Sequence, residues 1–280
     1  HKMTMFEMDL WMSMAYFIEQ QVDYCIIEAG MGGRLDATTA LDYKACLITN
    51  VGLDHTEYLG DTFEQIAYEK SGVFKPNVPA LTTEDKPECQ KVMELVADYM
   101  KTPLCFIDCQ ETDVLRWNGM TFHLNPPLYQ AKNLSLALET LNVLGIWLEE
   151  NEIQQVIDHF KWAGRYMVLR KDPLVLLDGA HNVHGITALT QSLKDFTGKI
   201  YFSVLKEKDA PHMIELLQSI SKDITLVEIS SARLYPLEKL GYPIITVDEL
   251  ISRLLDTKED SLLCGSLYYV GEVLEKWGNV

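Results

Sequence analysis

The sequence has little that would place it in a membrane, a disulfide framework or a complex with nucleic acid. No apolar run among its 280 residues reaches the length of about 20 that a spanning helix needs, and no basic and apolar leader opens the chain. Basic residues are scarce, with 24 Lys and Arg against 41 Asp and Glu, so the net charge of −17 would repel a phosphate backbone. We therefore expect a cytoplasmic protein that binds neither nucleic acid nor membranes.

The six cysteines lack the paired spacing of a zinc site or a disulfide framework. Most of them lie in apolar runs such as 24–27 and 262–264, so we expect buried free thiols in a reducing compartment. Apolar residues make up 48% of the chain and charged residues 23%, which is ordinary for a soluble globular protein. A chain of 280 residues is long enough for two modest domains, each with its own core.

The first half of the chain alternates short apolar runs with segments of helical periodicity. The apolar runs predict strands at 25–27, 46–49, 79–81 and 104–107, and Asn118-Gly119 predicts a hairpin turn between two further strands. The helical periodicity predicts helices at 6–22, 62–74, 87–100, 133–147 and 152–160.

The second half repeats the alternation, which indicates a second parallel sheet covered on both faces. Its predicted strands lie at 174–177, 200–204, 225–229, 244–247 and 262–264. The boundary falls in the Gly- and Pro-punctuated segment 163–172, so we expect one domain over 1–165 and another over 166–280. The predicted architecture is therefore α/β, with two lobes and a cleft between them.

The densest local motif is the glycine-rich segment 28–38, which begins with Glu28 and directly follows a predicted strand. Open α/β sheets bind ligands at the carboxyl ends of their strands, and glycines allow the backbone to approach a phosphate closely. An ordinary glycine-rich turn with an incidental acid explains the same pattern, because glycine motifs are weak signals on their own.

The next predicted strand ends in a second polar segment, 49–55, which contains Asp54 and His55. An acid from one strand end and a histidine from its neighbour are ligands for one divalent cation, and Mg²⁺ completes its shell with water and nucleotide phosphates. A structural histidine is the alternative. Lys70, by contrast, reads from its pattern alone as a solvated helix lysine.

Two strands of the second half also end in polar residues. Asp178 and His181 follow one of them and open a helix, where a carboxylate could bind a ribose or base and the helix amino terminus an anion. Ser266 follows the last strand, and a helix N-cap is its simpler interpretation.

Taken in order, these segments resemble the folylpolyglutamate synthase/dihydrofolate synthase family, relatives of the bacterial Mur ligases. The matching stretches are EAGMGGRLDATT, ITNVGLDHTEYLGDTFEQIAYEKSGVFKPNVP, YQAKNLSLALETL, AGRYMVL, DGAHNVHG, LKEKD and CGSLYYVGE. The resemblance implies a P-loop-type ATPase domain, like the central domain of Mur ligases, followed by a Rossmann-like C-terminal domain. It implies an ATP-dependent ligase that adds L-glutamate to dihydropteroate or folylpolyglutamate through an acyl phosphate, with Mg²⁺ as cofactor and a monomer as the default state.

The resemblance also assigns roles to residues. Glu28 and His55 would bind magnesium, and Lys70 would become a catalytic and metal-binding group if CO₂ carbamylates it. Contacts to ATP would come from Gln130, Asn133, Arg165 and Asp178. The incoming glutamate would be held by Ser266, Lys208 and His181, the last also being a catalytic residue.

The chain departs from the family pattern most clearly in its phosphate loop, because no Gly-Lys-Ser or Gly-Lys-Thr occurs in the sequence. We therefore expect a chain that lacks the front of the ATPase domain and is inactive as given. Smaller departures are Thr39 for the usual Asn, Ala163 for Pro, and Met167 for Glu. Two alternatives remain at this point: a Mur-type peptide ligase acting on a cell-wall precursor, and a noncatalytic binding protein.

Overall fold

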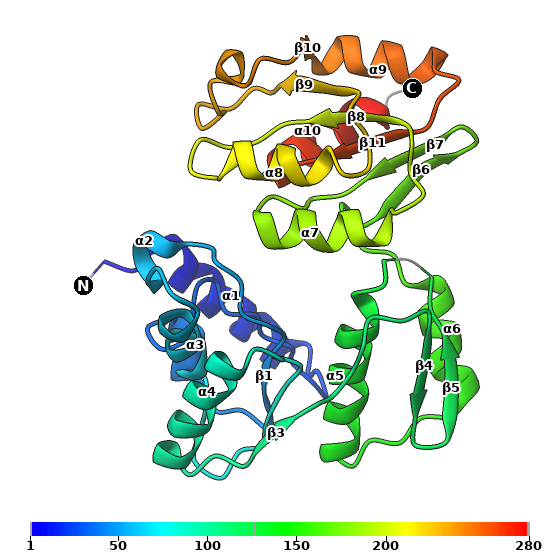
Figure 1. Ribbon diagram of the computed structural model, residues 1–280. Coiled ribbons are helices and arrows are strands. Elements are labelled where there is room, and N and C mark those ends of the chain that lie inside the picture. The colour runs from blue at the N-terminus through cyan, green and yellow to red at the C-terminus, as the bar shows by residue number, and fades with distance from the viewer. Residues whose placement is uncertain (1, 126, 279–280) are drawn as a thin grey trace. The chain divides into compact units, whose positions relative to one another are not determined.

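The computed structural model describes residues 2–125 and 127–278, which form two compact α/β units (Figure 1). Unit 1 consists of residues 1–110 and 132–148, and unit 2 consists of residues 111–131 and 149–280. Each unit consists of two separate stretches of the chain, whereas the prediction divides the chain once, at residue 165. That division stays a prediction, because compactness does not test which segments fold independently.

Unit 1 is built on a three-stranded parallel sheet in the order β1-β2-β3. The strands are β1 (Cys46–Ile48), β2 (Ala80–Thr82) and β3 (Leu104–Phe106). Two helices pack their apolar faces on it, α3 (Phe63–Ser71) through Ile66 and α4 (Pro87–Met100) through Met93. Both helices begin where the sequence predicts, α3 at a Thr62–Gln65 capping box and α4 at a first-turn proline. The short helix α2 (Thr56–Leu59), the 3₁₀ helix η1 (Ala37–Ala40) and α5 (Gln130–Val143) complete the elements of this part of the chain.

The first helix and the segment after it differ from the prediction in their burial. Helix α1 (Met5–Glu19) forms behind a Thr4–Glu7 capping box, but none of its residues is buried. Residues 25–27 form no strand, Ile26 is 95% exposed and Cys25 is exposed as well. The prediction of a buried strand here is wrong, because no strand in the described part of the chain pairs with this segment. All six cysteines are free thiols as expected, although Cys105 is also exposed.

Unit 2 contains a six-stranded sheet in the order β10-β9-β8-β11-β7-β6. The strands are β6 (Met167–Lys171), β7 (Leu174–Leu177), β8 (Lys199–Phe202), β9 (Ile224–Glu228), β10 (Ile244–Thr246) and β11 (Ser261–Cys264). Five of them are parallel, as predicted, and their apolar runs are buried. The sixth, β6, was not predicted; it pairs antiparallel with β7 at the edge, which brings residue 167 opposite residue 177.

Helices cover both faces of this sheet, as in a doubly wound fold (Figure 1). One core contains side chains of α7 (Val183–Ser192) and α8 (Ala210–Leu217) packed on residues such as Leu176 and Phe202. The other contains α9 (Val247–Asp256) and α10 (Leu267–Trp277) packed on residues such as Leu177 and Leu263. Neighbouring strand residues thus point to opposite faces, and the predicted α/β class is confirmed.

Unit 2 also contains the predicted hairpin of β4 (Val114–Trp117) and β5 (Met120–His123), with α6 (Glu150–His159) beside it. Asn118 and Gly119 both have positive φ, 48° and 82°, which the tight hairpin turn requires. The 3₁₀ helix η2 (Leu237–Leu240) lies before β10. No helix of the described residues combines the length and apolar character needed to cross a membrane.

Candidate functional site

The glycine-rich segment after Glu28 packs against the end of α3. A Cβ added to Gly33 would lie 2.7 Å from the Lys70 carbonyl oxygen, and one added to Gly72 would lie 2.2 Å from the Arg34 Cα. The Arg34 N–H donates to the Glu69 carbonyl at 2.7 Å. Only glycine fits where two backbones approach this closely, so at least these two glycines serve packing inside unit 1. The expected close approach of this loop to a phosphate stays a prediction.

This packing places Lys70 among acidic side chains. Burial lowers the pKa of Lys70, and the nearby carboxylates of Asp54 and Glu28 oppose that shift. The sequence pattern alone had suggested a solvated lysine, and the structure contradicts that interpretation. Half-burial beside two carboxylates is instead the kind of environment that is found at functional sites.

His55 follows Asp54 at the start of α2 and has a left-handed backbone, with φ of 51°. Its backbone N–H donates to the adjacent Asp54 carboxylate at 2.9 Å. Within residues 2–125 and 127–278, no three His, Cys, Asp or Glu side chains gather closely enough to hold a metal. The structure therefore brings Glu28 and Asp54 towards Lys70, and leaves the expected pairing of Glu28 with His55 untested.

In unit 2 the predicted residues gather at the carboxyl edge of the sheet. Asp178 follows β7 and is 3% exposed; its two carboxylate oxygens accept the N–H groups of Tyr166 and Ala180, both at 2.7 Å. Burial raises the pKa of Asp178, and those two hydrogen bonds and the charge of Arg165 oppose the rise. Arg165 precedes the antiparallel strand β6, and a Cβ on Gly179 would lie 2.9 Å from its Nη1. The antiparallel strand thus explains how Arg165 comes to lie beside Asp178.

The three residues predicted to bind glutamate follow three parallel strands that are neighbours in this sheet. His181 follows β7, and its Nδ1 lies 2.9 Å from the Gly179 carbonyl oxygen. Lys208 follows β8 and is half-buried. Ser266 follows β11, is 1% exposed, and its hydroxyl caps α10 by accepting the Tyr268 N–H at 3.2 Å. The capping role suggested by the sequence is confirmed, while the contact to glutamate stays a prediction.

The remaining predicted ATP contacts, Gln130 and Asn133, lie in the first turns of α5. Gln130 belongs to unit 2 with Arg165 and Asp178, whereas Asn133 belongs to unit 1 and is exposed. Sequence reasoning missed Tyr129, whose pKa burial raises to about 12, with Asp178 adding to the rise and Arg165 opposing it. Only its position before Gln130 could have suggested it.

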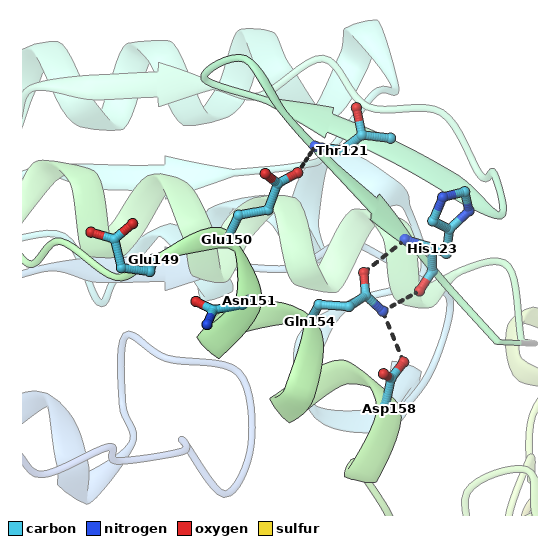
Figure 2. Close-up of a pocket in the computed structure, with 7 residues that line it drawn as sticks. All are labelled: Thr121, His123, Glu149, Glu150, Asn151, Gln154 and Asp158. Atoms are coloured by element: carbon cyan, nitrogen blue, oxygen red, sulfur yellow. Dashed lines mark hydrogen bonds between the residues drawn. The ribbon is translucent and has the colours of Figure 1, made fainter.

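A hollow on unit 2 lies between the hairpin and α6, and none of the predicted site residues lines it (Figure 2). Its polar groups already serve the free edge of β5: Glu150 accepts the Thr121 N–H at 2.8 Å, and Gln154 bonds both backbone groups of His123 at 3.0 and 3.1 Å. These side chains blunt a strand edge that would otherwise be open to pairing. The hollow therefore has a structural explanation.

Known proteins are similar to this chain in both of its halves. Residues 1–124 match the family model described as Mur ligase middle domain. A dihydrofolate synthase/folylpolyglutamate synthase of Buchnera aphidicola subsp. Acyrthosiphon pisum is 32% identical over 298 residues, which cover 97% of this chain and 71% of that protein.

Solved structures agree along nearly the whole chain. The FolC protein of E. coli in complex with ADP is 28% identical with a TM-score of 0.87, over 99% of this chain and 72% of that one. The bifunctional folylpolyglutamate synthase/dihydrofolate synthase of Yersinia pestis, complexed with AMPPNP and Mn ion, is 25% identical with a TM-score of 0.87 over the same shares. Both the fold and the enzyme class predicted from the sequence, an ATP-dependent ligase of this type, are confirmed.

Proposed function

Because this chain belongs to the dihydrofolate synthase/folylpolyglutamate synthase family of the Mur ligase superfamily, we propose that it adds L-glutamate to dihydropteroate, folylpolyglutamate or both. The observation that carries this proposal is the likeness to such enzymes across nearly the whole chain, in both sequence and fold. The Mur-type alternative is less well supported, because the relatives that match both units are glutamate ligases of folate compounds.

The reaction needs activation of a carboxylate, which is a poor acyl donor. ATP transfers its γ-phosphoryl group to the carboxylate oxygen, which gives an acyl phosphate and ADP. The glutamate amine then attacks the acyl carbon, loses a proton, and expels inorganic phosphate as the amide bond forms. Charge on the transferring phosphoryl group must be neutralised, and water must be kept from the acyl phosphate.

Glu28, Asp54 and the adjacent His55 carry the oxygen and imidazole donors that Mg²⁺ or Mn²⁺ accepts. No three such side chains gather in the described part of the chain, so water and nucleotide phosphates would supply the rest of the coordination shell. When bound, the ion would neutralise phosphate charge. The lowered pKa of Lys70 favours its neutral amine, which is the form that captures CO₂ to give a carbamate, an anionic ligand. We propose Mg²⁺ as the physiological ion and a cytoplasmic monomer as the working form.

The residues of unit 2 at the carboxyl edge of the sheet are proposed to bind ligands. Arg165 and Asp178, with Gln130 and with Asn133 of unit 1, are the proposed contacts to ATP. His181, Lys208 and Ser266 are proposed to hold glutamate. A cation such as Lys208 suits a glutamate carboxylate, and His181 could hold or accept the proton that the amine loses.

The test is phosphate release by the natural protein that contains this sequence. We expect release that requires ATP, Mg²⁺, L-glutamate and dihydropteroate or a reduced folate together, with a product heavier by one glutamyl residue. Release that does not depend on glutamate would contradict the proposal, and so would activity on a muramoyl peptide alone. The expected inactivity of the 280 residues by themselves stays a prediction, which the same assay tests.

A further inference from the structure

Unit 1 contains a buried carboxylate that the proposed function does not use. Glu84 follows β2, is 2% exposed, and its side chain has no exposed surface. Buried carboxylates are rare unless they are paired and hydrogen-bonded, because the charged form loses its hydration. The contacts of Glu84 therefore show what the charge is used for.

One carboxylate oxygen of Glu84 holds the turn that leads to the proposed metal site. Its Oε2 accepts the Val51 N–H, in the segment that connects β1 to Asp54 and His55. The neighbouring Thr83 hydroxyl donates to the Thr49 carbonyl at 2.6 Å. Two successive residues after β2 thus hydrogen-bond the turn after β1, one to a backbone N–H and the other to a backbone carbonyl. β1 is the strand with which β2 pairs.

The other oxygen fixes Glu84 itself. Its Oε1 accepts the Lys86 N–H at 2.8 Å and pairs with the Lys86 ammonium at 3.1 Å, while that ammonium lies 5.4 Å from the centre of the Phe63 ring. The Glu84 carbonyl accepts from Gln90 of α4 at 2.8 Å. The carboxylate is thereby fixed by Lys86, the residue before α4, and the Glu84 backbone is fixed by α4 itself.

The residue after Glu84 makes a further connection. Asp85 pairs with Lys132 of α5 at 2.7 Å, and Lys132 precedes Asn133, a proposed ATP contact. The short segment 83–86 is therefore bonded both to the turn before Asp54 and to the helix that carries Asn133. We propose that Glu84 is a positioning residue, which holds the 49–55 turn so that Asp54 and His55 face the divalent cation.

This inference rests on the proposed function, since it concerns the same metal site. Groups that orient metal ligands typically change metal affinity by about 10- to 100-fold when they are removed. A purely structural role would instead lower thermal stability and leave metal affinity unchanged. The two roles are thus separable by measurement.

The test compares Glu84→Gln and Glu84→Ala with Glu88→Gln, a control carboxylate in the first turn of α4. Hydrogen exchange of peptides covering residues 49–55 measures the turn directly, and Mn²⁺ binding by calorimetry or electron paramagnetic resonance measures the site. We expect faster exchange confined to 49–55 and Mn²⁺ affinity about tenfold lower in Glu84→Ala, with a smaller effect in Glu84→Gln because its amide oxygen still accepts one N–H. Glu88→Gln should match the unsubstituted protein.

The outcomes distinguish this inference from the proposed function. Unchanged exchange in 49–55, or faster exchange with unchanged Mn²⁺ affinity, would overturn the positioning role. If Glu84→Ala fails to fold, Glu84→Gln and Thr83→Val, which loosens the same turn, give the same two readouts. Failure of the unsubstituted protein to bind Mn²⁺ would instead refute the proposed metal site, and with it the function assigned to Glu84.

Discussion

Replacing Gly72 by alanine tests the close packing of the glycine-rich segment on α3. The backbone of Gly72, with φ of −62° and ψ of −9°, suits alanine, so the only obstacle is space. The new Cβ would lie 2.2 Å from the Arg34 Cα and 2.5 Å from its backbone nitrogen, against about 3.5–4.0 Å for an ordinary contact. Backbone atoms cannot rotate away, so the segment must shift.

The magnitude follows from two opposing effects. Overpacking costs about 1–3 kcal/mol, and the loss of unfolded-state freedom on replacing glycine returns about 0.4–1 kcal/mol. Because the obstacle is backbone, we expect a net loss of about 2 kcal/mol, which lowers the Tm of a unit of this size by roughly 4–8 °C.

The control is Gly271→Ala in α10, where the added Cβ meets nothing within 4 Å. There we expect stabilisation by about 0.5–1 kcal/mol, since alanine is the better helix former. Urea unfolding monitored by hydrogen exchange assigns each change to its own unit. If Gly72→Ala left the free energy of unfolding unchanged or raised it, the packing argument would be refuted. The glycines would then be explained by phosphate binding or by chance.

Three further predictions concern the proposed site residues. Lys70→Met should raise the Tm at pH 7 and abolish Mg²⁺-dependent ligase activity. The stability gain follows because the pKa of Lys70 is lowered on folding. The cost of burying its charge is therefore present below the folded pKa and disappears as the pH rises towards 10.5. The pKa of Asp178 is raised on folding, so its contribution to stability is present below about pH 4 and is lost as pH rises through the folded pKa; Asp178→Asn should flatten that dependence in urea midpoints measured from pH 4 to 7. Ser266→Ala should lower the free energy of unfolding by about 1 kcal/mol through the lost cap and raise the KM for glutamate; an unchanged KM would leave the cap as its only role.

Local chemistry explains which parts of the fold the sequence predicts. Helix α4 begins at Pro87 and ends at Met100 as expected, because a first-turn proline and a regular apolar stripe mark it. The hairpin turn at Asn118 likewise needs only local residues. The strand predicted at residues 25–27 does not form, because an apolar run gives a buried strand only where a neighbouring strand can pair with it. Strand β6 was missed because it lies at the sheet edge and its side chains are polar at one end.

The candidate site divides in a similar way. Asp178 and Ser266 could be predicted to lie near one another because each follows an apolar strand, and the carboxyl ends of parallel strands share one edge. Glu28 follows an apolar run that forms no strand, so this reasoning does not place it. Glu84 could not be predicted, since its burial depends on contacts to the turn after β1, which is distant in sequence, and to the Lys86 ammonium. Lys70 was misjudged from its pattern for the same reason: its burial comes from the loop that covers α3, a contact between residues that are far apart in sequence.

The glycine-rich segment therefore links stability with chemistry in unit 1. Gly33 lies against the Lys70 carbonyl, and the Arg34 side chain bonds Glu69 at 2.7 Å, so the segment after Glu28 is held against the turn that carries Lys70. Any shift in this packing moves Glu28 relative to Lys70, the two groups that approach one another in the proposed metal site. A substitution such as Gly72→Ala should consequently weaken Mn²⁺ binding as well as stability, whereas Gly271→Ala should change stability alone.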